Sequence, residues 1–257
     1  MSAMEKMKIS GEKRVEISKS SAISLEDGSI ATIIIRPDID SEVKVDAGKD
    51  CRITVFSIQD KPVRISMANR LGPGSELDSF SLWLQGSEGS TSNELAGNGS
   101  RVYDSHILVG KDGSDQKITA KLVHYGKGTS GDIAINGVLI GKSKAAVDGL
   151  VKVMKTGSGA QSLLSGKVLL LDDGSSAMIR PDIEIENNDV STKHAATVSK
   201  ISEEKIFYLM SRGLTKEEAK GAIAAGLLTA AFDRIGDDAL KKEFSEKTMA
   251  RICDNSV

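Results

Sequence analysis

The sequence predicts a mainly β protein with a helical C-terminal tail, and three observations lead to this fold class. Short segments rich in Ile, Val, Leu and Thr recur over the first three quarters of the chain. Turn pairs such as Asp27-Gly28 and Asp173-Gly174 separate them. Helical periodicity is found only in the last quarter. We therefore expect a β body over residues 1–197 and a helical domain over residues 198–257.

Ten segments of strand length are predicted in the body. Each is rich in apolar or β-branched residues and is bounded by turn residues. They cover residues 29–40, 51–58, 62–67, 79–86, 105–110, 117–126, 132–141, 145–153, 167–173 and 176–186. The N-terminal residues carry no comparable signal, so we expect them to be irregular.

A sandwich, a barrel and a solenoid are all compatible with this strand pattern. Two features favour a solenoid. The strand signals continue at short intervals over a length that is long for one sandwich, and "EDGSIATIIIRPDID" at 26–40 resembles "DDGSSAMIRPDIEIE" at 172–186. Chance recurrence of common turn and strand residues is the alternative explanation of this second feature.

The tail is predicted to form three short helices. Ser202 is a suitable N-cap for the first, and Gly213, for which we expect a positive φ, is a suitable C-terminal cap. Thr215 and Glu218 have the spacing of a capping box at the start of the second helix. The third helix is expected to follow Asp238.

The apolar residues of the tail predict which helix faces are buried. Leu240 and Phe244 lie one turn apart. A stripe at helical spacing runs through Ala219, Ile223, Leu227 and Ala230. Because three short helices bury little surface alone, we expect them to pack on the β body or on a partner. A chain ending near Lys200 is expected to stay folded.

Composition excludes several classes of protein. The net charge of −2 and the isoelectric point near 6.0 argue against a nucleic-acid-binding protein. We find neither an apolar run long enough to span a membrane nor the apolar region of a secretory signal. The two cysteines, Cys51 and Cys253, lie far apart. We therefore expect a cytoplasmic protein with reduced thiols.

The catalytic motifs that we sought are absent from the sequence. His106, His124 and His194 occur in unrelated contexts without a nucleophile elbow. The P-loop pattern fails because Asn136 stands where its first glycine is required. Zinc-ligand spacing is also missing. Glu184 and Glu186, on one face of a strand, are best explained as a solvated surface. We expect that this chain is not an enzyme.

Of the three histidines, His194 is the one whose role is least determined by its sequence context. It follows the last clear strand and precedes the helices, in a polar stretch. From the residues alone it is either a loop histidine bonded to the backbone or an accessible imidazole with a task. These observations do not choose between the two.

Residues 181–223, "PDIEIENNDVSTKHAATVSKISEEKIFYLMSRGLTKEEAKGAI", resemble the C-terminal signature of the SufB/SufD family of iron–sulfur cluster assembly proteins. The signature joins a strand, an Asp-Val pair, a histidine, an acidic helix start and a Ser-Arg-Gly. The positions that fit are Pro181, Glu184, Ile185, Asp189, Val190, His194, Ala196, Thr197, Phe207, Tyr208, Ser211, Arg212 and Gly213.

The resemblance implies a right-handed parallel β-helix followed by a small helical domain. It implies that a SufC-like ABC ATPase docks on this domain, and that nucleotide binds to the ATPase rather than to this chain. A second SufB/SufD-type subunit, a copy or a paralogue, would pair through the β-helix. An iron–sulfur cluster would form transiently at that interface, where His194 would be a ligand or relay. The residues expected to bind the ATPase are Phe207, Tyr208, Met210, Arg212, Leu214 and Ile223.

This chain departs from the SufB pattern at two positions. Gly166 stands where SufB-type chains carry a core cysteine, and Ala195 stands where they carry a glutamate. The resemblance therefore favours a non-catalytic, SufD-like scaffold subunit or a compact homologue of both types. Two rival functions are a secreted-type β-helix enzyme acting on polysaccharides and a purely structural interaction module.

Overall fold

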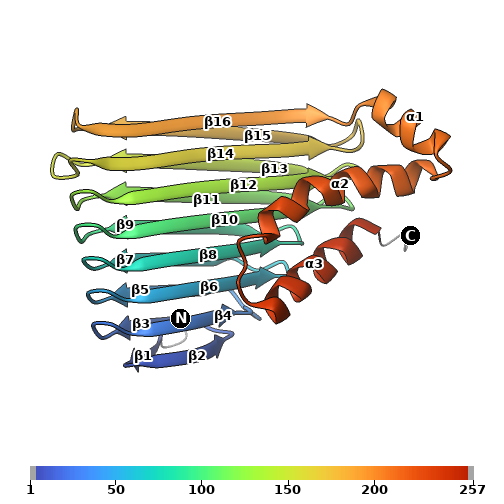
Figure 1. The fold of residues 1–257 in the computed structure, drawn as a ribbon. Helices are drawn as coiled ribbons and strands as arrows, with labels where there is room; N and C mark the ends of the chain where they lie inside the picture. Colours follow the sequence, from blue (N-terminus) through green and yellow to red (C-terminus); the bar gives the residue numbers. More distant parts are fainter. Residues whose placement is uncertain (1–3, 254–257) are drawn as a thin grey trace.

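The computed structural model describes residues 4–253, and its strands form two parallel eight-stranded sheets. Strands alternate between the sheets along the chain, so each pair of consecutive strands makes one coil of a parallel β-helix (Figure 1). Sheet A contains β1 (Glu5–Ile9), β3 (Ser21–Leu25), β5 (Ser41–Ala47), β7 (Ile65–Leu71), β9 (Glu88–Leu95), β11 (Asp115–His124), β13 (Lys144–Val153) and β15 (Ser176–Ile185). Sheet B contains β2 (Glu12–Ile17), β4 (Ile30–Ile35), β6 (Arg52–Gln59), β8 (Glu76–Trp83), β10 (Arg101–Gly110), β12 (Ser130–Leu139), β14 (Ala160–Leu170) and β16 (Val190–Lys200).

The main core fills the interior of the solenoid. Because alternate side chains of a strand point to opposite faces, every second residue enters the interior. Parallel pairing in register then stacks like positions into columns, such as Ile33, Val55 and Ser79 in sheet B. The interior is mostly Ile, Val and Leu, and it is continuous from the first coil to the last.

A repeated Gly-x-Gly-Ser/Thr turn links the strands of sheet A to those of sheet B, as at 72–75, 97–100 and 126–129. Its first glycine is required because coils stack closely: a Cβ on Gly97 would lie 2.0 Å from the backbone nitrogen of Pro73. Its second glycine, Gly99, has φ +69°, a conformation that favours glycine. The turn chemistry therefore sets the stacking of the coils.

The helices are α1 (Glu203–Ser211), α2 (Lys216–Phe232) and α3 (Asp238–Cys253). As Figure 1 shows, α2 and α3 lie across sheet B, whereas α1 stands beyond its last strand. Phe232 and Phe244 join a second apolar core with outward-facing residues of sheet B, including Phe56 and Phe80. The expectation that the tail packs on the β body is confirmed for α2 and α3.

The caps predicted for the helices are present. Ser202 is the N-cap of α1, and Thr215 with Glu218 forms the capping box of α2. Gly213 has φ +98°, and the Leu214 and Gly213 amides donate to the Leu209 and Met210 carbonyls. These two bonds form a Schellman cap.

Several expectations differ from the structure. The residues expected to be irregular form β1, β2 and β3. Charged outward positions hide the alternating pattern of β1 and β2, and β3 has only five residues. The resemblance between 26–40 and 172–186 is not a structural repeat, since β4 lies in sheet B and β15 in sheet A. His194 lies within a strand, not in a loop.

The stripe predicted on α2 is also displaced. Ala219 is buried, but Ala230 is exposed, and the buried residues further along are Ala224, Leu228, Ala231 and Phe232. The run of alanines leaves the apolar period ambiguous, and the contact with sheet B decides which face is buried. The expectation that a chain ending near Lys200 stays folded remains a prediction, and such a chain would expose Phe56 and Phe80, which share a core with α2 and α3.

Candidate functional site

His194 lies on β16, the last strand of sheet B, at the C-terminal end of the solenoid (Figure 1). It pairs in register with Leu164, which pairs with Ile133, and both of these belong to the interior core. The histidine therefore occupies an interior column. The residue is exposed, and in the described part of the chain its side chain forms no hydrogen bond or ion pair.

The interior columns end in an open mouth. On β16, Thr192, Ala196 and Val198 alternate with outward-facing residues and continue the columns of β14. Val198 is 41% exposed, whereas Val168 directly beneath it is buried. Over residues 4–253 no strand pairs with the outer edge of β15 or β16. The mouth, defined by these three residues and His194, thus combines apolar side chains, an imidazole and free backbone groups.

The N-terminal end of the solenoid has a different character. Its edge strands β1 and β2 are rich in Glu, Lys and Arg, which discourage pairing between sheet edges. Its interior residues Ile9, Val15 and Ile17 are buried. Within residues 4–253, the C-terminal end is thus where exposed interior side chains lie together with an uncharged stretch of edge, from Ala195 to Ser199.

The two positions at which this chain departs from the SufB pattern lie close to this mouth. Gly166 pairs with Ala196 in the register, and a Cβ on Gly166 would contact Ile179 at 3.1 Å. Position 166 is therefore an interior position one coil below the mouth. Ala195 precedes the interior-facing Ala196 and lies on the opposite face of β16.

The other two histidines are buried in the solenoid. His106 Nε2 lies 3.2 Å from Asp104 Oδ2, and the Trp83 indole donates to His106 Nδ1 at 3.3 Å. His124 Nδ1 lies 2.8 Å from the Thr129 hydroxyl, and burial lowers the His124 pKa to about 4. Neither side chain has any exposed surface.

Both cysteines are free thiols, as expected, but their surroundings differ. Cys51 is fully buried and takes the serine position of the repeated turn, where its thiol donates to the Glu26 carbonyl at 3.1 Å. It therefore has a structural role in a turn. Cys253 is exposed at the end of α3.

The carboxylates of the last coil are part of a solvated surface. Glu184 accepts from Lys152 Nζ at 2.7 Å, and Glu186 lies 3.7 Å from the same nitrogen. The pKa of Glu184 is lowered, first by its hydrogen bond with Lys152. Across residues 4–253, no three His, Cys, Asp or Glu side chains form a group that could hold a metal ion.

The second exposed surface is α1, which follows β16 directly. Phe207 is 74% exposed, Tyr208 56% and Met210 44%, whereas Ile206 is the buried residue of this helix. Three large exposed apolar side chains on one nine-residue helix are unusual for a surface in contact only with water. We refer to Phe207, Tyr208 and Met210 as the α1 patch.

The remaining residues expected to bind a partner lie around this patch. Arg212 stands over the Tyr208 ring at 5.2 Å and donates to its hydroxyl at 3.0 Å, which fixes the ring. Leu214 is half-buried. Ile223 packs partly against the core beneath α2 and lines a groove with Tyr208 and Leu209. The structure thus places the six residues near each other, with Ile223 and Leu214 the least accessible.

Comparison with known families decides the identity of this architecture. The SufBD core domain of SUF-system iron–sulfur cluster assembly matches residues 9–227, which is most of the solenoid, α1 and much of α2. The chain belongs to the SufB/SufD family. The match includes His194 and the α1 patch, so both exposed surfaces lie within the family's core domain.

Individual SufB/SufD relatives cover smaller parts. SufD of Bacillus subtilis, an iron–sulfur cluster assembly protein, is 29% identical over 181 residues, 68% of this chain and 41% of the relative. SufB of the same organism is 34% identical over 152 residues, 57% of this chain and 33% of the relative. A SufBD family protein of Mycobacterium leprae is 36% identical over 122 residues, 48% of this chain and 14% of the relative.

The matched region is thus less than half of the length of each of these three SufB/SufD relatives. These relatives include both a SufD and a SufB protein. Within residues 4–253, no helix has the length and apolarity required to cross a membrane.

Proposed function

We propose that this SufB/SufD-family protein is a non-catalytic scaffold subunit of a cytoplasmic SUF-type assembly complex. The observation that carries the proposal is the pair of exposed surfaces on one continuous segment, the mouth on β16 and the α1 patch that follows it. A scaffold that joins two partners needs two binding surfaces. Exposed apolar side chains of this extent mark such surfaces in soluble proteins.

The mouth is proposed to pair with a second SufB/SufD-type subunit, a copy or a paralogue. Free edges of β15 and β16 can each add a strand by main-chain hydrogen bonding. The pairing would cover Val198 and Ala196, which the chain leaves exposed. The charged edges of β1 and β2 make the opposite end a poor alternative.

An iron–sulfur cluster, the product under assembly, is proposed to form transiently at this interface with His194 as a ligand or relay. A neutral imidazole binds iron, and the ring of His194 has no partner within the described chain. Gly166 and Ala195 supply no ligand atoms in their side chains. The second subunit would therefore complete the ligand set.

The α1 patch is proposed to dock a SufC-like ABC ATPase, which supplies nucleotide chemistry that this chain does not. An amphipathic helix whose apolar residues face solvent is suited to insertion into a groove on a partner. The groove beside Tyr208, lined by Leu209 and Ile223, would accept an apolar side chain of the ATPase in return.

Co-purification with the ATPase tests the proposal. Phe207→Ser combined with Met210→Ser should abolish co-purification while leaving the circular dichroism of the chain unchanged, because neither side chain is buried. Ile39→Ser is the matched control, since Ile39 is 53% exposed and lies between β4 and β5, towards the opposite end of the solenoid from α1. Undiminished binding by the double variant would reject the docking site.

A further inference from the structure

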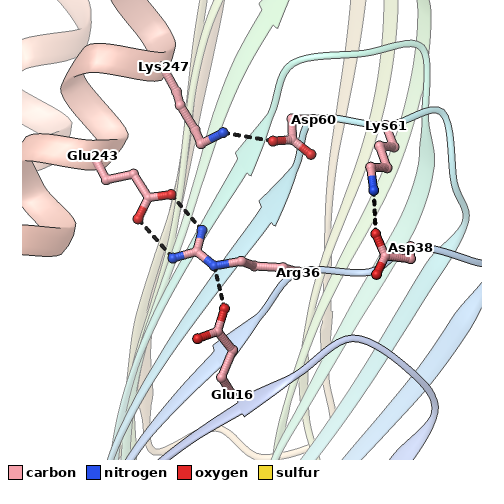
Figure 2. A network of polar contacts seen from close by, with 7 residues as sticks. All are labelled: Glu16, Arg36, Asp38, Asp60, Lys61, Glu243 and Lys247. Carbon is pink, nitrogen blue, oxygen red and sulfur yellow. Dashed lines mark hydrogen bonds and ion pairs between the residues drawn. The ribbon is translucent and has the colours of Figure 1, made fainter.

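The C-terminal helix reaches back to the first coils of the solenoid. Glu243 of α3 accepts two hydrogen bonds from the Arg36 guanidinium, at 2.5 and 2.8 Å, and Arg36 also donates to Glu16 of β2 at 2.7 Å (Figure 2). Arg36 and Glu243 are separated by 207 positions in the sequence. A paired arrangement of this kind fixes both distance and orientation.

Two further ion pairs extend this contact. Lys247 donates to Asp60 at 2.7 Å, as Figure 2 shows, and Arg14 of β2 donates to Asp237 at 2.6 Å. The Arg36–Glu243 pair is partly shielded from water, with side chains that are 34% and 28% exposed. Shielding makes this pair worth more than pairs on an open surface.

Apolar contacts lie beneath these ion pairs. Phe244 is fully buried and meets the ring of Phe56 at 5.8 Å in an edge-to-face arrangement. Ile34 of β4 belongs to the same core. The helix therefore rests on the second and third coils, and its charged residues extend the contact to the first.

The coils that α3 reaches include those expected to be the least stable. β1 to β4 have five or six residues each, whereas β10 to β16 have ten or eleven. In a solenoid each coil is stabilised mainly by its neighbours, so a terminal coil has support on one side only. Short terminal coils are thus the part expected to open first.

We propose that α3 is a strap that sets how often the first two coils, β1 to β4, open as a unit. The strap acts through Arg36, which bonds to Glu243 of α3, and through Arg14, which bonds to Asp237 directly before α3. The helix itself is anchored on sheet B by its apolar residues. Loss of these ion pairs releases β1 to β4 while the later coils keep their packing. This device is separate from the α1 patch and from the mouth, and it does not depend on the proposed function.

Hydrogen exchange measured by mass spectrometry on the full chain tests the strap. In Glu243→Gln, amides of β2 and β4 should exchange about ten-fold faster than in the wild type, while those of β12 and β14 keep their rates. Glu246→Gln is the matched control, because Glu246 is on the same helix and, among residues 4–253, pairs with Lys242 alone, at 3.7 Å. Glu246→Gln should leave the amide exchange rates of every strand unchanged.

Salt concentration and a second variant provide further tests of the ion pairs. Raising sodium chloride from about 0.05 to about 1 M should accelerate amide exchange in β2 and β4 of the wild type. The acceleration should be smaller in Glu243→Gln, because salt screens an ion pair that this variant has already lost. Arg14→Gln, which removes the pair with Asp237 and leaves the Arg36 pair in place, should accelerate amide exchange in β2 and β4 by the same factor, because the two coils open together. Unchanged protection of β2 and β4 in Glu243→Gln, or equal acceleration in all coils, would overturn the proposal.

Discussion

His194 pairs with Leu164 in the register of sheet B, and the two side chains belong to the same interior column of the solenoid. Leu164 is 1% exposed, whereas His194 is exposed. The difference arises because β16 covers Leu164, while within residues 4–253 no strand covers β16. A residue at an interior position of an uncovered coil is available to a partner without any rearrangement of the fold.

Replacement of His194 by glutamine should therefore separate stability from function. His194→Gln should change the free energy of unfolding by less than about 0.5 kcal/mol, because an exposed side chain without partners contributes little. Iron–sulfur assembly by the reconstituted complex should fall at least ten-fold if the imidazole binds or relays iron. Lys193→Gln, on the neighbouring outward position, is the control and should assemble clusters normally. Normal assembly by His194→Gln would show that the histidine has no such task.

Charge placed in the mouth should prevent pairing. Val198→Glu would place a carboxylate on a side chain that is 41% exposed in the single chain but covered in the proposed pair. Burial of an unpaired charge costs several kcal/mol, so co-elution with the second subunit should be lost while the chain stays folded. Thr119→Glu, on the exposed face of β11, should have no effect. Retained co-elution of Val198→Glu would place the interface elsewhere.

The interior packing makes a prediction that is independent of function. A Cβ on Gly89 would lie 2.0 Å from the ring of Trp83, which has no exposed surface. Gly89→Ala should therefore destabilise the fold by about 1–3 kcal/mol through overpacking. Gly226→Ala on α2 is the control, because no atom lies within 4 Å of its Cβ position and alanine favours a helix. Denaturant unfolding should show a lower free energy of unfolding for Gly89→Ala and no decrease for Gly226→Ala.

Sequence reasoning predicted the β body, the helical tail and the caps because these depend on local chemistry. Turn glycines, the Thr215–Glu218 spacing and Gly213 act over a few residues, and the structure confirms them. The short strands β1 to β3 were not predicted, since each has only five or six residues and is held by pairing with strands of neighbouring coils. The solenoid itself followed from the resemblance, as the strand pattern alone also fitted a sandwich or a barrel.

The candidate site was only partly predictable. His194 stood out through the family signature, but its place in an interior column follows from the pairing of β16 with β14, which the sequence does not reveal. Ala196 and Val198 were missed as members of the mouth. Their alternation with polar residues was visible, yet only the lack of a covering coil makes these apolar residues accessible. The strap formed by α3 could not be predicted, because Arg36 and Glu243 meet across 207 positions.

The last prediction concerns His124, whose burial gives the fold a dependence on pH. Its pKa is lowered from 6.5 to about 4 by burial, so the folded chain keeps the ring neutral where the unfolded chain protonates it. Below pH 6.5 the unfolded state binds more protons, and stability should fall as pH decreases towards 4, by roughly 3 kcal/mol in total. His124→Leu should remove this contribution, because its register neighbours Leu95 and Val153 are buried apolar residues. Urea unfolding at several pH values between 7 and 4 should show a smaller loss of stability in the variant, and equal slopes in both proteins would contradict a neutral buried His124.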